Sequence, residues 1–202
     1  AVKTSGLKDI MAAASKSEKG SLEQKVGDYY ASGMDTLTIE KLGAEPLKPA
    51  LAEIDAVTDH NSLMKLVGKF AASGEDYLIG YYVGADDKNS AMNILTMYQS
   101  GLTLPEKEYY TRTDSATEAS RLAMKKHITD LFVLCGEEKT IAEKNAGIIL
   151  ALETEMAKSH RSPVELRNPQ LNYNKMPVAE LQKRSPNINW KELFGAIGIS
   201  TD

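Results

Sequence analysis

The sequence predicts a mostly α-helical protein with one small antiparallel β-hairpin near residues 78–98. Three features support this fold class: polar signatures that open helices, apolar residues that recur with the period of a helix, and one run rich in aromatic and β-branched residues. The composition, 42% hydrophobic and 26% charged, is typical of a folded globular chain. We therefore expect residues 1–202 to form a single helical domain or a segment of one.

Helix starts are predicted where a Ser or Thr hydroxyl can accept a hydrogen bond from the backbone amide three residues later. The Glu or Gln at that later position can in turn accept from the amide of the Ser or Thr. The stretches with this pattern are Ser21-Leu-Glu-Gln24, Ser115-Ala-Thr-Glu118 and Thr140-Ile-Ala-Glu143. Ser162-Pro163-Val-Glu165 opens a further turn, because proline is tolerated at the first helical position. Shorter helices are expected at Leu7–Ser15, Pro49–Val57, Ser62–Ala72, Pro177–Arg184 and Trp190–Ile197.

Two longer helices should each bury one apolar face. After Thr140, to about Ser159, the predicted stripe consists of Ile141, Ile148, Ile149, Leu152 and Met156. After Ser115 it consists of Met124, Ile128, Leu131, Phe132 and Cys135, and Gly136 ends the helix. Cys135 is therefore predicted to be a small core residue and not a nucleophile.

The hairpin is predicted from two strand-like runs, Ile79-Gly-Tyr-Tyr-Val83 and Met92-Asn-Ile-Leu-Thr-Met-Tyr98. The polar segment between them contains Asp86-Asp87, whose carboxylates can bond the turn backbone. Turn chemistry is the favoured interpretation of this acidic pair. A role as ligand for a divalent cation is less favoured, because the alternating acidic pattern of a calcium loop is absent.

No catalytic, cofactor-binding or metal-binding residue is predicted in this chain. The three histidines, His60, His127 and His160, lack the four-residue spacing that points two imidazoles at one metal. We interpret His127 as a boundary or surface residue, and the other two as solvated or helix-capping residues. Glu153 and Glu155 diverge by about 200° around a helix, so they cannot act jointly as acid and base.

Cysteine and tyrosine usage narrows the remaining possibilities. A single cysteine excludes an intrachain disulfide and a multi-cysteine metal site. The tyrosine doublets Tyr29-Tyr30, Tyr81-Tyr82 and Tyr109-Tyr110 are expected to place one ring inward and one at the boundary, with a binding or interdomain surface as the alternative. The glycine-rich loops of nucleotide-binding proteins and the nucleophile elbow of hydrolases are absent.

Charge and hydropathy restrict the partners. The formal net charge of −4 argues against nucleic acid as a partner of the whole chain. The longest apolar run, Ala146–Leu152, is far shorter than the roughly 18–20 residues that span a bilayer, so no transmembrane segment is predicted. The first residues include no initiator Met and no leader, which suggests a removed signal segment or a chain cut from a longer one.

Three stretches together resemble the neprilysin and endothelin-converting-enzyme type of zinc metallopeptidase. The first runs from Val83-Gly-Ala-Asp-Asp-Lys-Asn-Ser90 through Asn93-Ile94 to Gln99-Ser-Gly-Leu-Thr-Leu-Pro-Glu-Lys-Glu-Tyr-Tyr110. The second runs from Leu152-Glu-Thr-Glu-Met-Ala157 to Arg167-Asn-Pro-Gln-Leu-Asn-Tyr-Asn-Lys-Met176. The third joins Tyr30-Ala-Ser-Gly-Met-Asp35 to Ile39-Glu-Lys-Leu-Gly-Ala-Glu-Pro-Leu47. Their order and spacing resemble the family over nearly the whole chain.

This resemblance implies a segment from the N-terminal half of a larger enzyme. Family members carry a His-Glu-x-x-His helix with two zinc ligands and the general base, a later Glu ligand and an Asn-Ala-Tyr-Tyr substrate-binding stretch, and none of these matches a position here. Zinc is therefore expected in the intact enzyme and not in this chain. The implied partners are the catalytic lobe of the same protein and peptide substrates, whose entry the helical region limits across a central cavity.

The resemblance also implies a source and a location. Gly33 stands where disulfide-rich animal members have Cys, so the chain is similar to a bacterial member. Parent enzymes of this type are exported, as periplasmic, lipid-anchored or secreted proteins.

The leading hypothesis is a non-catalytic, substrate-gating and structural portion of a zinc metalloendopeptidase, inactive alone. The alternative is an independent helical module that binds peptides or proteins through a tyrosine-rich face. A free-standing enzyme that uses isolated carboxylates is least favoured, because no carboxylate pair has suitable geometry.

Overall fold

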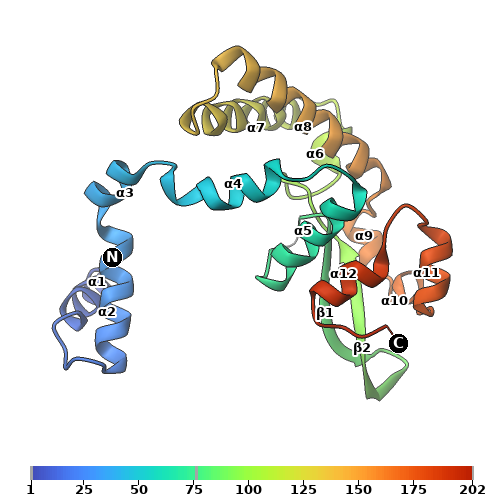
Figure 1. Cartoon of the computed structure of the whole chain (residues 1–202), viewed down its shortest axis with the longest axis horizontal. Coiled ribbons are helices and arrows are strands. Elements are labelled where there is room, and N and C mark those ends of the chain that lie inside the picture. The colour runs from blue at the N-terminus through green and yellow to red at the C-terminus, as the bar shows by residue number, and fades with distance from the viewer. Residues whose placement is uncertain (1, 76, 202) are drawn as a thin grey trace. The chain divides into compact units, whose positions relative to one another are not determined.

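The computed structural model describes residues 2–75 and 77–201, which form two compact units, Ala1–Lys48 (unit 1) and Pro49–Asp202 (unit 2) (Figure 1). Helices dominate both units, and the described residues contain one sheet, a two-stranded antiparallel hairpin in unit 2. The predicted fold class is therefore confirmed.

Unit 1 consists of short helices joined by tight turns. They are α1 (Val2–Ala14), α2 (Leu22–Met34), α3 (Thr36–Leu42) and a 3-10 helix (Glu45–Leu47). Helix α2 begins as predicted, because the Ser21 hydroxyl accepts from the Gln24 amide at 3.1 Å. The Gln24 side chain reaches back one residue further than expected, to the Gly20 amide at 2.5 Å.

Unit 1 buries little of its own surface. Helices α1 and α2 pack together around Gly27, where a side chain would lie 2.0 Å from the Ser15 amide nitrogen. Among residues 6–48, whose burial the structure describes, Gly27 is the one buried residue. Its exposed large apolar residues are Leu7, Ile10, Leu22, Val26, Tyr29, Met34, Leu37, Ile39, Leu42 and Leu47. Helices this short are stabilised mainly by packing of an apolar face, and these apolar side chains lie exposed in unit 1.

The hairpin of unit 2 forms where the sequence predicts it. Strand β1 (Ile79–Asp86) pairs antiparallel with β2 (Asn89–Gln99), with Ile79 opposite Gln99 and Val83 opposite Leu95. The register shifts between Ala85 and Asp86, which marks an irregularity next to the turn. An isolated two-stranded ribbon is marginal in water, so the helices that cover it determine its stability.

Helices from both ends of unit 2 cover one face of this hairpin. They are α5 (His60–Ala72) and α12 (Trp190–Ala196), and they also contact one another. The core between them centres on Trp190, Leu193 and Phe194, against Val67, Ile79, Leu95 and Met97. Helix α4 (Lys48–Asp55) precedes α5, and α11 (Val178–Arg184) precedes α12.

A second core lies between the long helices α7 (Ser115–Leu134) and α8 (Lys139–Ser159) and the short helix α6 (Glu108–Thr111). Its buried members are Tyr110, Met124 and Ala157. The one-turn helices α9 (Pro163–Leu166) and α10 (Pro169–Asn172) follow α8. The turn predicted at Ser162 is present, with Pro163 at the first helical position, and it is closed by a capping box in which the Ser162 hydroxyl and the Glu165 carboxylate each accept from the other's amide.

The predicted capping residues of the two long helices are wrong. Asp114 caps α7 by accepting from the Thr117 amide, and Glu138 caps α8 by accepting from the Thr140 and Ile141 amides. In both cases a carboxylate just upstream of the predicted hydroxyl replaces it. A carboxylate is the stronger acceptor and also interacts favourably with the helix dipole.

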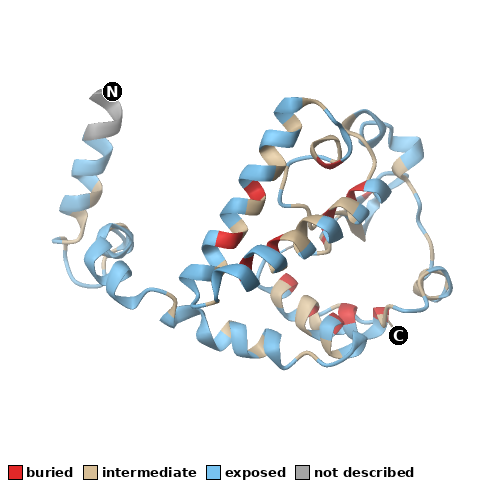
Figure 2. Ribbon diagram, turned by 90° about the horizontal axis from the view of Figure 1, so that it is seen from above, coloured by how far each residue is buried: buried red, intermediate tan, exposed pale blue. Residues whose placement is uncertain are grey.

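The predicted buried faces of these helices are also only partly right. On α8, Ile141, Ile148 and Leu152 are more than half exposed, and the buried side chains are Ala142, Ala146, Glu153 and Ala157 (Figure 2). On α7, Met124 is buried as predicted, but Leu131 and Cys135 are exposed. Small residues on α8 allow the two helices to approach closely, so the larger apolar side chains lie outside the contact.

Candidate functional site

Asp86 anchors the tip of the hairpin to a distant segment of unit 2. Its side chain is buried and accepts from the Lys175 ammonium at 2.6 Å, the Tyr173 hydroxyl at 2.9 Å and the Lys88 amide at 2.9 Å. These hydrogen bonds, with that of Lys175 the largest cause, lower the pKa of Asp86 to about 2. The Lys88 ammonium lies 4.3 Å from the centre of the Tyr173 ring. The carboxylate is occupied by these donors, which supports the turn interpretation over a cation site.

This anchor predicts a pH dependence of stability. Because the pKa of Asp86 is lower in the folded than in the unfolded chain, its contribution is complete above its ordinary value of 3.8 and is lost as the pH falls toward about 2. Asp86→Asn should lower the melting temperature at pH 7 by roughly 3–8 °C, because the Lys175 ammonium loses its anion. At pH 2.5 the same substitution should lower the melting temperature by less, because part of the Asp86 carboxylate is then protonated in the unmodified chain.

Thermal unfolding followed by circular dichroism at pH 7, 4 and 2.5 checks this expectation. Asp87→Asn is the matched control, since Asp87 is the adjacent exposed carboxylate. Two results would contradict the proposed role of Asp86. One is an equal fall in melting temperature for both substitutions, and the other is a fall for Asp86→Asn that is as large at pH 2.5 as at pH 7.

Glu153 forms the second polar anchor, inside the core between α6, α7 and α8. It accepts from the Thr103 amide and the Thr103 hydroxyl, each at 2.8 Å, and from the Tyr110 hydroxyl. The Tyr110 hydroxyl in turn accepts from the Leu104 amide at 2.8 Å. Burial, and then the Glu153 carboxylate, raise the pKa of Tyr110 above its ordinary value. The loop 100–107 is thereby fixed to helix α8.

A pocket of about 280 Å³ with both polar and apolar groups in its wall lies beside this loop, and Lys107, His160 and Arg161 line it. The Gln99 side chain donates to the Arg161 carbonyl at 3.0 Å and accepts from the Arg161 amide at 2.8 Å. The Lys107 ammonium donates to the His160 carbonyl at 2.6 Å. Burial and then Lys107 lower the pKa of His160 below its ordinary value. The side chains of Gln99 and Lys107 thus connect the segment after β2 to the backbone at residues 160–161, just after α8.

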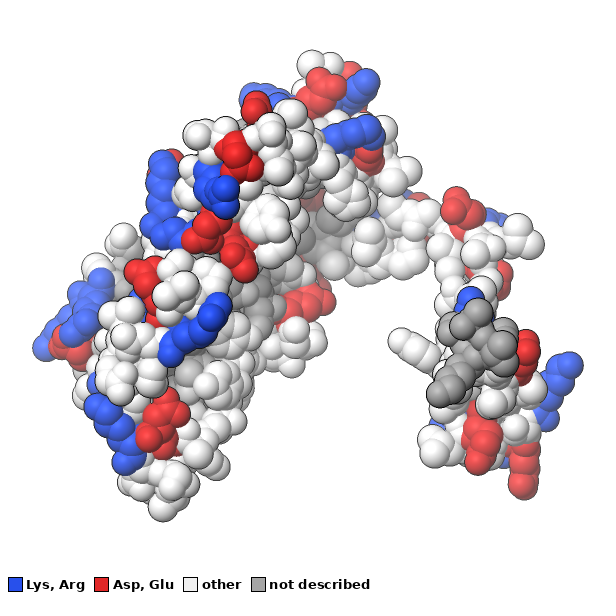
Figure 3. All heavy atoms as spheres, turned by 180° about the vertical axis from the view of Figure 1, so that it is seen from behind, with Lys and Arg blue, Asp and Glu red and all other residues white. Residues whose placement is uncertain are grey.

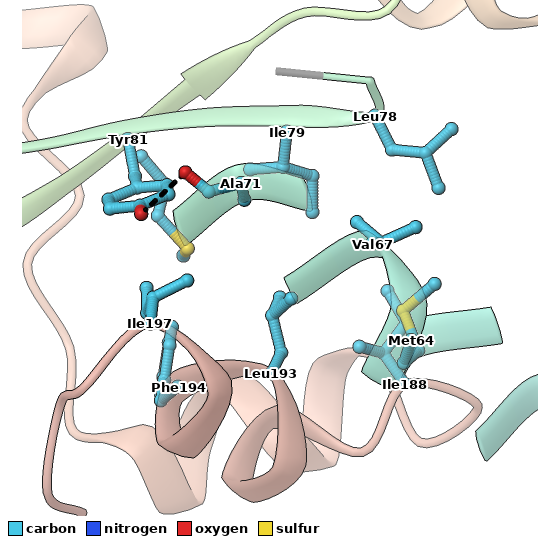
Figure 4. Close-up of a pocket in the computed structure, with 11 residues that line it drawn as sticks. Met64, Val67, Ala71, Leu78, Ile79, Tyr81, Ile188, Leu193, Phe194 and Ile197 are labelled. Carbon is cyan, nitrogen blue, oxygen red and sulfur yellow. Dashed lines mark hydrogen bonds between the residues drawn. The ribbon is translucent and has the colours of Figure 1, made fainter. Parts of the chain in front are cut away.

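An apolar cavity of about 230 Å³ lies between α5, the hairpin and α12 (Figure 4). Side chains from all these elements point into it, among them Ala71 from α5, Tyr81 from β1 and Ile197 from the end of α12. The Tyr81 hydroxyl donates to the Ala71 carbonyl at 3.1 Å. The cavity is thus lined by apolar groups, with its one hydroxyl already paired.

The structure does not bring the three histidines together. His127 is exposed, as interpreted from the sequence, His60 is the first residue of α5, and His160 caps the end of α8. Each tyrosine doublet has one more exposed ring, as predicted: Tyr29 and Tyr82 are 84% and 55% exposed, and Tyr110 is the buried member of its pair.

The sequence does not predict the partners of the two anchors. It presents Glu153 only as half of a pair with Glu155, which is exposed and forms an ion pair with Lys158. A signal for Glu153 does exist, because it shares the helical period of Ala142, Ala146 and Ala157 and is the one carboxylate on that face. Tyr173 and Lys175 carry no local signal.

The surface charges and the long helices restrict the chemistry of the described chain. Figure 3 shows basic and acidic side chains interspersed over unit 2, without a field of one sign on the face in view. Within residues 2–75 and 77–201, no group of three or more His, Cys, Asp or Glu side chains could hold a metal ion. None of the helices in those ranges is long and apolar enough to cross a membrane.

The helices, the single hairpin and the two anchors define a helical segment whose own apolar surface is incompletely covered. The sequence profile of peptidase family M13 matches residues 2–202. The chain belongs to this family. The resemblance to neprilysin and endothelin-converting enzymes is thereby confirmed.

Known relatives support the same assignment. The chain is 28% identical over 204 residues to Neprilysin-3 of Drosophila melanogaster and 29% identical over 207 residues to endothelin-converting enzyme-like 1 of Rattus norvegicus. These matches cover 93% and 95% of this chain but 25% and 26% of the relatives, so the chain spans about a quarter of their length.

A solved structure matches the fold. The zinc metalloprotease Zmp1 of Mycobacterium tuberculosis, in complex with an inhibitor, superposes with a TM-score of 0.87 at 33% sequence identity. The match covers 98% of this chain and 30% of that one. Both units of the chain therefore have counterparts in a bacterial member of the family.

Proposed function

We propose that the chain is a non-catalytic, substrate-gating and structural part of a bacterial zinc metalloendopeptidase that hydrolyses peptides. Zinc and the catalytic residues belong, in this proposal, to the remainder of the parent protein, and the enzyme is exported. Support comes from the family membership, from the likeness to a mycobacterial zinc metalloprotease, and from the share of the relatives that the chain spans.

The observation that carries the proposal is an apolar stripe on helix α8. Ile141, Ile148 and Leu152 are 53%, 56% and 58% exposed, and their spacing places them on one side of the helix. Contiguous exposed apolar surface usually marks an interface. A catalytic lobe of the same protein that packs on this stripe and on unit 1 would cover both.

The two anchors suit a structural role of this kind. Glu153 and Asp86 each fix a loop or a hairpin to a segment distant in the sequence. A wall that limits the size of an entering peptide must keep its shape, and such a wall also excludes water from the metal site of the other lobe. Gating therefore needs anchors but no catalytic group in this chain.

The first test measures hydrolysis of a short fluorogenic peptide by the chain with added zinc. We expect no turnover above buffer, and turnover that a chelator abolishes in the parent enzyme. Chelator-sensitive hydrolysis by the chain alone would show that it is not the non-catalytic part.

A second test asks whether the apolar stripe of α8 is an interface. The chain should bind an apolar dye and associate with itself, and Ile148→Glu should reduce both effects severalfold. Ala151→Glu is the control, since it adds the same charge at an exposed position of α8 outside the stripe. A monodisperse chain without dye binding that still binds peptides would instead favour the independent binding module.

A further inference from the structure

The apolar cavity between α5, the hairpin and α12 has an unusual combination of size and lining. Protein interiors are packed to crystal density, and voids larger than a water molecule are few. This one measures about 230 Å³ and is lined by eleven residues, of which Tyr81 alone carries a side-chain oxygen or nitrogen. Seven of the eleven lining residues are half-buried, so the cavity opens toward the surface and a small molecule can enter it.

Two features keep the cavity open. Ala71 stands at 6% exposure on the α5 side, where any larger apolar side chain would fill part of the space. The Tyr81 hydroxyl bonds the Ala71 carbonyl, so the whole phenol spans the distance between β1 and α5 (Figure 4). The strand is thus held away from the helix by a side chain of fixed length.

The lining selects the chemistry of an occupant. A water molecule needs two to four polar partners, and the single hydroxyl here is already engaged. A charged ligand would lose its hydration without compensation. A dry apolar cavity of roughly 150 Å³ is sufficient to bind benzene, and this volume exceeds that. We propose that the cavity is a binding site for a small, uncharged molecule with one apolar ring.

Trp190 provides a reporter for this site. It is the one tryptophan of the chain and is 3% exposed. The centre of its ring lies 5.7 Å from the ring centre of Phe194, which lines the cavity. Bromobenzene in the cavity would bring a heavy atom near the indole. We expect saturable quenching that lowers the fluorescence at least twofold, whereas the charged analogue 4-bromobenzoate gives only weak, linear quenching.

A matched pair of variants on α5 locates the binding. Ala71→Phe fills the cavity and should abolish the saturable component, whereas Ala72→Phe adds the same ring at the exposed neighbouring position and should leave it unchanged. Circular dichroism checks the fold of both, and Ala71→Leu replaces Ala71→Phe if the larger ring reduces the helical signal. Linear quenching of the unmodified chain would overturn the proposal, as would saturable quenching that survives the filling substitution.

Discussion

Replacing Glu153 with alanine is expected to lower the free energy of unfolding of unit 2 by about 3–5 kcal/mol. The carboxylate is 7% exposed and accepts from the Thr103 amide, the Thr103 hydroxyl and the Tyr110 hydroxyl. Alanine would remove the acceptor for all three donors in a place that water hardly reaches. It would also leave a void between α6 and α8.

Urea unfolding followed by circular dichroism measures this change. Glu153→Gln should cost less, about 1–2 kcal/mol, because the amide keeps one accepting oxygen and can donate to the Thr103 hydroxyl. Glu155→Ala is the matched control two residues along α8, where an exposed ion pair with Lys158 contributes less than about 1 kcal/mol. A Glu153→Ala chain as stable as the Glu155→Ala chain would show that the buried carboxylate does not hold the loop.

The fold class and the hairpin could be predicted because their signals are local. The runs that form β1 and β2 are rich in aromatic and β-branched residues and flank a polar turn, so pairing of neighbouring strands follows from the sequence. The face of α8 could not be predicted in the same way. A helical period identifies an apolar stripe but does not identify what covers it, and Ile148 and Leu152 are exposed while Ala142 and Ala146 are buried.

The candidate sites depend on contacts between distant parts of the chain. Asp86 is 87 residues from Tyr173 and 89 from Lys175, and Glu153 is 50 from Thr103. No spacing rule connects such pairs, because they meet only after the helices pack. The sequence therefore supports Asp86 as a turn residue but does not show its partners. The cavity is even less accessible to prediction, since it consists of residues that all resemble ordinary core.

Gly101→Ala is the second substitution with a large expected effect. Gly101 has a φ of +88°, a conformation that costs a side-chain-bearing residue about 1–2 kcal/mol. A Cβ atom there would lie 2.1 Å from the Tyr77 carbonyl oxygen and 3.0 Å from the Met156 methyl group. The contact with a backbone atom cannot be relieved by a change of rotamer, so the loop must move. We expect a total loss of about 3–5 kcal/mol in unfolding free energy.

The displacement should extend to the Glu153 anchor, because Thr103 follows Gly101 by two residues and donates to that carboxylate. The loss of unfolding free energy in the double variant Gly101→Ala, Glu153→Ala should therefore be smaller than the sum of the two single losses, since either substitution disconnects the loop from α8. Gly147→Ala in α8 is the control. A Cβ atom there would lie 3.8 Å from the Lys125 Nζ atom, an ordinary contact, and alanine should stabilise the helix by about 0.5–1 kcal/mol. The expectation would be contradicted if the losses of unfolding free energy from the two substitutions were fully additive, or if the Gly101→Ala chain were as stable as the unmodified one. Either result would show that the loop accepts the methyl group while Thr103 stays bonded to Glu153.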